Sequence, residues 1–180
     1  GLTEGKHCSV CSEVIVAQEI VPIIDHIEGE WIVDKAAIKT EDGSQHTECI
    51  MCHKVMQSQI IPATGSPGLA FKLNSDEASY SVTGIGTCTD AEVVIPAVYN
   101  GKPVTSIGAN AFSGCKNLTS INIPDSVTAI GSEAFAWCSG FTGNLVIPDG
   151  VTSIGNYAFY SCANLTQIDM PYGVISIGNS

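Results

Sequence analysis

One motif repeated along the C-terminal part of the chain constrains the fold more than any other feature. The copies begin at Val104 (VTSIGANAFSGCKNLTSINIPDS), Val127 (VTAIGSEAFAWCSGFTGNLVIPDG) and Val151 (VTSIGNYAFYSCANLTQIDMPYG), and a fourth begins at Val174. They are 23, 24 and 23 residues long, and the first and third are identical at 13 of 23 positions. A fixed period of this length predicts a solenoid, in which each coil buries its apolar side against the next coil.

The apolar positions of the repeat indicate which side chains form the core. In the first copy they are Val104, Ile107, Ala111, Phe112, Cys115, Leu118, Ile121 and Ile123, and all stay apolar in the next two copies. Residues 118–123 alternate as a strand does, and a proline ends this strand in each copy. Gly108 follows the VTSI strand, where the turn needs a positive φ or a close backbone approach. The Ala-Phe pair predicts a single helical turn whose ring fills the core. The AF-x-x-C cysteine is interpreted as core packing, because a free cysteine behaves as a small buried hydrophobe.

The pattern VTSIG-x-x-AF-x-x-C-x-x-L-T-x-I-x-IP resembles the BspA-like leucine-rich repeats of bacterial surface proteins, over roughly residues 68–180. The resemblance implies a mainly β fold, a leucine-rich-repeat solenoid of short strands with single helical turns. It also implies a role in adhesion and in contact with a host or matrix, without a fixed active site.

The chain divides into three parts. Residues 104–180 carry the repeats. Residues 67–103 predict an N-terminal cap and a partial repeat, because Leu69–Gly84 alternates on either side of Asn-Ser-Asp-Glu as a hairpin does, and Val93–Pro96 looks like the end of a repeat. Residues 1–66 hold all four histidines and no AF-x-x-C, and predict a small β module that contains cysteines.

Two C-x-x-C pairs in this small module predict a zinc site. Cys8 and Cys11 form the first pair, Cys49 and Cys52 form the second, and four thiolates can close a tetrahedral Zn²⁺ site. His26 is an alternative ligand that could complete a site with Cys8 and Cys11. Zinc bound in this way would be a structural cofactor, and it would stabilise a module too small to be held by its core alone.

The same cysteines fit other states. Each pair could form a local disulfide in an exported protein, or remain a dithiol. In redox enzymes of the thioredoxin type, C-x-x-C lies at the start of a helix in a βαβ unit. The β-branched residues around these pairs favour strands, so redox catalysis is not the expected function. Residues 1–66 also resemble the small C-x-x-C…IPATGH modules found beside surface repeats in some bacteria. That pattern often carries a further cysteine near Lys39 and a histidine at the position of Ser66. This chain has neither, which argues against a separate second metal site.

Charge and motif content exclude several classes of function. The chain has 18 acidic residues, 7 lysines and no arginine, and its net charge is -11. Nucleic acids and anionic lipids are bound through Lys and Arg, so neither is an expected partner. No apolar run is long enough to insert across a membrane. No G-x-S-x-G, G-x-x-x-x-G-K or H-E-x-x-H motif is present, and the repeats contain no histidine. We therefore expect a protein that is not an enzyme, and the resemblance to BspA-like repeats implies an extracellular or cell-surface location.

Strand alternation predicts a binding face on the solenoid. Six side chains should point outward from the strands that end at the prolines: Ser120, Asn122, Asn144, Val146, Gln167 and Asp169. They are polar and mostly uncharged, which suits hydrogen bonding to a host or matrix protein or to a glycan. The alternative is that this face is only solvated and that the protein is a structural spacer or display scaffold within a larger surface protein. A third hypothesis, a zinc- or thiol-dependent enzyme, would need turnover linked to the C-x-x-C pairs.

Overall fold

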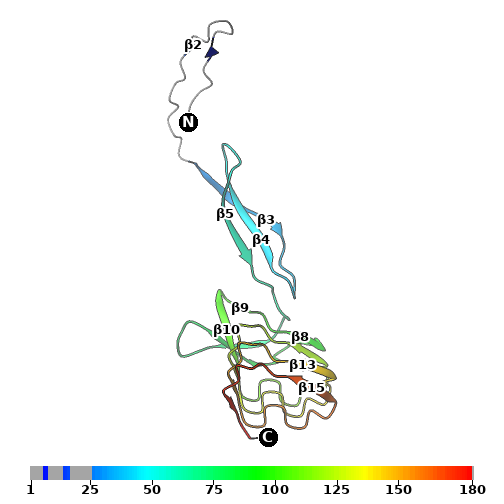
Figure 1. Cartoon of the computed structure of the whole chain (residues 1–180). Helices are drawn as coiled ribbons and strands as arrows, with labels where there is room; N and C mark the ends of the chain where they lie inside the picture. The colour runs from blue at the N-terminus through cyan, green and yellow to red at the C-terminus, as the bar shows by residue number, and fades with distance from the viewer. Residues whose placement is uncertain (1–5, 8–13, 17–25, 180) are drawn as a thin grey trace. The chain divides into compact units, whose positions relative to one another are not determined.

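The computed structural model describes residues 6–7, 14–16 and 26–179, which form strands and turns and include no helix (Figure 1). These residues therefore contain no helix that could cross a membrane. The chain forms two compact units: residues 1–32 with 46–58, and residues 33–45 with 59–180.

The N-terminal strands form two small sheets. Strand β1 (Lys6–His7) pairs antiparallel with β2 (Val14–Val16). A second sheet has the order β3 (Glu28–Lys35), β4 (Gly43–Cys49), β5 (Val55–Ile61). Strand β4 has buried residues at Gly43, Thr47 and Cys49 and half-buried residues between them, whereas β3 and β5 are exposed along almost their whole length.

One wall of the solenoid is built from the VTSI segments. The strands are β6 (Ala70–Leu73), β7 (Tyr80–Gly84), β9 (Val98–Tyr99), β10 (Lys102–Ile107), β12 (Ala129–Ile130), β14 (Ser153–Ile154) and β16 (Ser176–Ile177). Strands β7, β10, β12, β14 and β16 run parallel in that order, so successive repeats lie side by side. At the N-terminal edge β6 pairs antiparallel with β7, which is the hairpin that the sequence predicts for Leu69–Gly84.

A second wall carries the strands that end at the prolines. It consists of two parallel pairs: β8 (Glu92–Val94) with β11 (Ser120–Asn122), and β13 (Gly143–Val146) with β15 (Leu165–Asp169). No ladder joins β11 to β13, and β13 has a register shift between Gly143 and Asn144. Gly143 has φ of 78°, and this is the place where the middle repeat has its extra residue. The insertion therefore interrupts the wall between the first and second coils.

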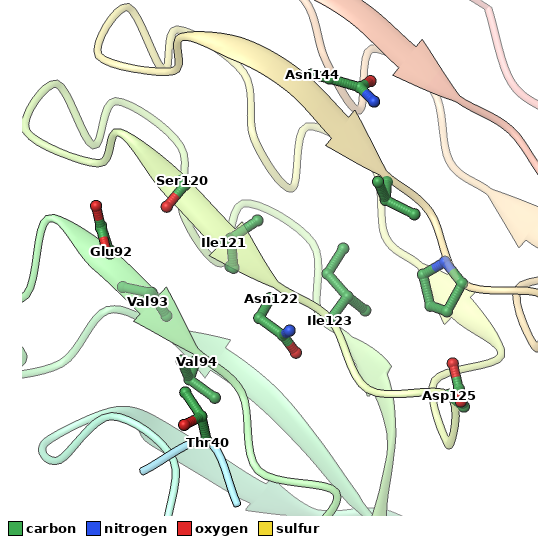
Figure 2. Close-up of a pocket in the computed structure, with 12 residues that line it drawn as sticks. Thr40, Glu92, Val93, Val94, Ser120, Ile121, Asn122, Ile123, Asp125 and Asn144 are labelled. Atoms are coloured by element: carbon green, nitrogen blue, oxygen red, sulfur yellow. The ribbon is translucent and has the colours of Figure 1, made fainter.

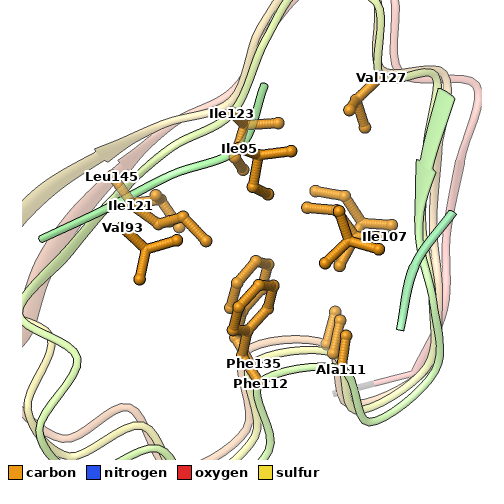
Figure 3. Close-up of a cluster of buried hydrophobic side chains, with 14 of the residues drawn as sticks. Val93, Ile95, Ile107, Ala111, Phe112, Ile121, Ile123, Val127, Phe135 and Leu145 are labelled. Atoms are coloured by element: carbon orange, nitrogen blue, oxygen red, sulfur yellow. The ribbon is translucent and has the colours of Figure 1, made fainter. Parts of the chain in front are cut away.

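Equivalent apolar side chains form ladders between the two walls. Figure 3 shows Val93, Ile121 and Leu145 gathered on one side of the core, and Ile107 on the other. The rings of Phe112 and Phe135 are fully buried and stack with centroids 5.4 Å apart and planes 5° apart. Phe159 continues the stack at 5.5 Å and 4°. The predicted mainly β solenoid of stacked coils is confirmed.

The Ala-Phe segment differs in detail from the expected helical turn. The Phe112 N–H donates to the carbonyl of Ala134 in the next coil at 2.7 Å, and the Phe135 N–H donates to Ala158 at 2.8 Å. An α-helix would use these N–H groups within the same segment. Asn110 (φ 58°) and Gly114 (φ 74°) are also left-handed, and a right-handed helix cannot contain such residues. The segment is therefore a series of tight turns, and every second N–H bonds to the neighbouring coil.

The glycines after the VTSI strands allow close approach between coils. A Cβ on Gly131 would lie 2.5 Å from the backbone N of Ala109, and one on Gly155 would lie 2.3 Å from that of Ser132. Neither glycine has a positive φ. Glycine is therefore needed at these positions for the close approach between coils and not for a positive φ.

The repeated cysteines pack in the core, as predicted. Cys138 is buried, and its Sγ donates to the Phe112 carbonyl at 3.0 Å; Cys162 Sγ donates to the Phe135 carbonyl at 3.1 Å. Burial raises the pKa of Cys138 to about 12 and also raises the pKa of Cys115 and of Cys162. These thiols therefore stay protonated at neutral pH, and a protonated thiol is a poor nucleophile.

Candidate functional site

The outer face of β11, β13 and β15 carries the six side chains that the sequence singles out. Each strand has one residue that points into the core, Ile121, Leu145 or Ile168, and the residues on either side of it are exposed. The exposed residues are Ser120, Asn122, Asn144, Val146, Gln167 and Asp169. Strand alternation thus orients these side chains outward, while their role in binding stays a prediction.

Strand β8 extends this face by one more coil. In the register of the parallel pair, Glu92 lies beside Ser120 and Val94 beside Asn122. Sequence reasoning did not include Glu92 among the site residues, although aligning EVVIP with SINIP would have placed it there. We call the outer side of β8, β11, β13 and β15 the strand face.

A hollow of about 410 Å³ opens on the strand face where the wall is interrupted (Figure 2). It is lined from both sides of the interruption, by Ser120 and Asn122 of β11 and by Asn144 and Val146 of β13. The remaining lining residues are Thr40, Glu92, Val93, Val94, Ile121, Ile123, Asp125 and Pro148. No sequence signal could have found Thr40, because it comes from a separate segment of the chain.

Hydrogen bonds hold the polar groups of β13 and β15 in place. Asn144 Nδ2 and Gln167 Nε2 each donate to the Asp169 carboxylate at 2.5 Å. The Asn144 bond first, and the Gln167 bond second, lower the pKa of Asp169. The carboxylate is therefore ionised at neutral pH and offers a fixed negative acceptor at the edge of the strand face.

The chemistry of the hollow is that of hydrogen bonding. Its lining offers two hydroxyls, two amides, two carboxylates and the apolar Val146, whose side chain is 60% exposed. Neither a histidine nor a cysteine lines the hollow, and its acidic residues are Glu92 and Asp125.

A separate cluster of possible metal ligands lies in the N-terminal unit. The ligand atoms of His26, Cys49 and Cys52 are all within 4.8 Å of one another, and both thiols are free. Cys52 Sγ lies 3.3 Å from His26 Nδ1. In a tetrahedral zinc site a sulfur and a nitrogen ligand are about 3.6 Å apart, so the donors fit with a small adjustment.

The turn between the two cysteines is shaped to present both sulfurs. The His53 N–H donates to the Cys49 carbonyl at 2.8 Å, and the Met51 N–H donates to Cys49 Sγ at 3.4 Å. His53 has φ of 56°, which turns the chain back immediately after Cys52. The hydrogen bond with His26 first, and that from the Met51 N–H second, lower the pKa of Cys49 to about 6. These hydrogen bonds favour the thiolate of Cys49, which is the form that binds metal.

The other predicted ligands, Cys8 and Cys11, lie outside the described residues. A site of four cysteines, or of Cys8 and Cys11 with His26, therefore stays a prediction. Within the described residues, His26 is grouped with the second C-x-x-C pair. The sequence raised His26 only as a partner of the first pair, because only the tertiary structure could bring it to Cys49.

Comparisons with known proteins show which family the solenoid belongs to. The family described as a BspA type leucine-rich repeat region (6 copies) matches residues 91–180, half of the chain. The chain belongs to the BspA-type leucine-rich repeat family. The family and the solenoid fold predicted from the repeats are thus confirmed, whereas the resemblance of residues 1–66 to IPATGH-type modules stays a prediction.

Two solved leucine-rich repeat proteins are similar to the solenoid. A leucine-rich repeat protein from T. pallidum (TpLRR) is 31% identical, with a TM-score of 0.59 over 62% of this chain and 51% of that chain. A leucine-rich repeat protein from Bacteroides capillosus is 30% identical, with a TM-score of 0.56 over 61% of this chain and 83% of that chain. The chain thus matches about half the length of the T. pallidum protein. No curated protein matches it.

In this BspA-type protein, the two positions that depart from the IPATGH pattern meet at one carboxylate. Lys39 Nζ lies 2.8 Å from Asp90 Oδ2 and also donates to the Glu92 carbonyl at 2.7 Å. The Ser66 hydroxyl donates to Asp90 at 2.8 Å and accepts from the Val94 N–H at 2.9 Å. Lys39 and Ser66 thus attach their segments to β8, beside the strand face.

Proposed function

We propose that the solenoid is a non-catalytic recognition module, extracellular or at the cell surface, that binds a protein or glycan partner through the strand face. The hollow between β11 and β13 is the observation that carries this proposal, because four of the six predicted side chains line it. Repeat solenoids commonly use such extended surfaces for binding.

The polar groups of the strand face favour a partner rich in hydrogen-bond donors. Asp169 is held in place by Asn144 and Gln167, so it can accept a further hydrogen bond with little loss of side-chain entropy. In the hollow between β11 and β13, Glu92 and Asp125 provide negative charge, and Val146 provides an exposed apolar contact. Sugar hydroxyls, or the polar side chains of a host or matrix protein, would complement these groups.

Binding to arrays followed by mutation tests this proposal. The full chain is applied to a glycan array and to an array of host and matrix proteins, and affinities are measured for each partner captured. The double variant N122A/N144A should weaken binding by about tenfold or more, since each amide contributes roughly 0.5–1.5 kcal/mol through its hydrogen bonds. The control N117A/T128A changes two exposed side chains outside the strand face and should leave the affinity unchanged.

Two results would overturn the proposal. The first is equal affinity of N122A/N144A and the unmodified chain for every captured partner. The second is the absence of capture on both arrays, which would favour the alternative of a structural spacer or display scaffold.

We also propose that His26, Cys49 and Cys52 bind zinc as a structural cofactor. Two thiolates and one imidazole are a donor set that zinc prefers, and the spacing of the donors supports the proposal. The weak burial of the surrounding strands supports it as well, because β3 and β5 bury almost no side chain. A small module with little core gains stability from a bound metal.

Metal analysis and thiol counting distinguish the zinc-bound, disulfide and dithiol states of Cys49 and Cys52. We expect about one zinc per chain by elemental analysis, lost in C49S/C52S and retained in the control C88S. If C8S/C11S also loses its zinc, the four-cysteine site predicted from the sequence is the correct one. Absence of zinc together with two fewer reactive thiols would indicate a disulfide, and absence of zinc with all thiols reactive would indicate a dithiol. Either result would end the zinc proposal.

A further inference from the structure

Three aromatic side chains and one carboxylate form an exposed cluster on the turn side of the second and third coils. Trp137, Tyr157 and Tyr160 are 55%, 44% and 47% exposed, respectively. Together with Glu133 they line a hollow of about 280 Å³. This cluster is separate from the strand face, since none of its residues lines the hollow between β11 and β13.

The rings are arranged as the walls of a cage. The centroid of Tyr160 lies 5.1 Å from that of Trp137 and 5.9 Å from that of Tyr157. The plane of Tyr160 is nearly perpendicular to both, at 83° and 82°. Perpendicular rings cannot cover one another as stacked rings do, so π surface stays open to a ligand in the hollow.

The backbone at this cluster is unusual for the residues it holds. Trp137 has φ of 62° and Tyr157 has φ of 56°, in the left-handed region that bulky residues rarely adopt. In the first coil the equivalent positions hold Gly114 and Asn110, which tolerate this conformation well. The same two positions are left-handed in every coil, at Glu133 and Ser161 as well, so this conformation belongs to the turn of the repeat. The side chains of Trp137 and Tyr157 are about half exposed, so burial in the core does not explain the aromatic residues at these positions.

The charge around the cluster is one-sided. In the described part of the chain the Glu133 carboxylate makes no ion pair and no side-chain hydrogen bond. The sequence contains no lysine after Lys116, no histidine after His53 and no arginine anywhere. A cation in the hollow would therefore meet aromatic faces and a free carboxylate, and no basic residue of the repeats around it.

We propose that Glu133, Trp137, Tyr157 and Tyr160 form a binding site for quaternary ammonium groups. The negative faces of aromatic rings attract cations, and Trp provides the strongest such surface. A quaternary ammonium group is the best match, because it has no N–H to be satisfied and sheds its water readily. The Glu133 carboxylate supplies the counter-charge. This site acts independently of the proposed strand-face function and of the zinc site.

Ligand-observed NMR titration of the full chain with choline tests the proposal. Choline should bind saturably, and its neutral isostere 3,3-dimethylbutan-1-ol should bind about tenfold more weakly or not at all. This alcohol has the same shape but a carbon in place of the charged nitrogen. Equal binding of the two compounds would overturn the proposal, because the hollow would then be only an apolar surface.

The first coil supplies variants that keep the fold. W137G and Y157N introduce the residues that the first coil already holds at these positions, so both should remain folded, as checked by circular dichroism. Each should weaken choline binding by about tenfold, and E133Q by several-fold. The control Y172A removes an exposed tyrosine outside the cluster and should have no effect. Unchanged affinity in W137G would contradict the proposal.

A trimethyllysine peptide and phosphocholine distinguish two sources of the quaternary ammonium group, a methylated peptide and a choline ester. Both carry the quaternary nitrogen, and binding of either one that W137G abolishes supports the site. We expect phosphocholine to be the weaker ligand, since its phosphate would be repelled by Glu133. Failure of both, together with failure of choline, would overturn the proposal and leave the strand face untouched.

Discussion

Lys39 Nζ lies 2.8 Å from Asp90 Oδ2, and the same oxygen accepts a hydrogen bond from the buried Ser66 hydroxyl. Lys39 first, and Ser66 second, hold the pKa of Asp90 below its ordinary value of 3.8. These contacts join residues 33–45 and the segment after β5 to the partial coil that contains β8.

This contact should make stability depend on acid pH. A carboxyl group whose pKa is lower in the folded state stabilises the protein above the unfolded pKa, near 3.8, and loses that contribution as pH falls through the folded pKa. Below about pH 4 the melting temperature of the unmodified chain should therefore fall more steeply than that of D90N. D149N is the control, because the Asp149 carboxylate forms no ion pair in the described part of the chain. Parallel curves for D90N and the unmodified chain would contradict the prediction.

The Phe135 ring should be the most sensitive point of the core. It is fully buried and stacks on Phe112 on one side and Phe159 on the other, so its removal leaves a cavity that neither neighbour can fill. We expect F135A to lower the free energy of unfolding by about 3–5 kcal/mol in urea denaturation. F159A should cost less, because Phe159 is only partly buried. A loss of less than about 1 kcal/mol in F135A would mean that the stack contributes little.

Gly131 should resist substitution for a steric reason. Its added Cβ would lie 2.5 Å from the Ala109 nitrogen, which belongs to the adjacent backbone and cannot move aside as a side chain would. We expect G131A to destabilise the protein by about 1–3 kcal/mol, measured by thermal melting. G173A is the matched control, because its Cβ would meet only the Asp149 carbonyl at 3.4 Å, an ordinary contact. Equal melting temperatures of the two variants would refute the close approach between coils.

Cys138 should be the least reactive thiol of the native protein. Burial raises its pKa to about 12, and its S–H donates to the Phe112 carbonyl. Iodoacetamide at about pH 8 should therefore leave Cys138 unmodified in the folded chain and alkylate it after denaturation. Peptide mass spectrometry measures both states. Exposed Cys52 is the internal comparison once bound metal has been removed, and faster labelling of Cys138 than of Cys52 in the native state would contradict the structure.

The repeat region could be predicted from the sequence because its core is local and periodic. The positions of Val104, Ile107 and Phe112 recur at nearly constant spacing, and burial of an apolar face every 23 or 24 residues has only one economical solution, the stacking of coils. Alternation along residues 118–123 likewise determined that Ser120 and Asn122 point outward, since the side-chain period of a strand is two. The predicted helical turn was wrong in detail, because the N–H of Phe112 finds its acceptor in another coil.

Contacts between distant segments were decided by the tertiary structure alone. Nothing in the sequence links Thr40 to Asn122 or His26 to Cys49, because these pairs have no shared period and meet only after the chain has folded. Trp137 and Tyr160 are 23 residues apart, so the repeat period alone brings them to neighbouring coils. Periodicity specifies which face of a strand is buried. It does not predict which exposed side chains from non-repeated segments lie close together. The sequence by itself thus determined the solenoid and its outward side chains, whereas the hollow and the ligand cluster arise from the packing of one segment on another.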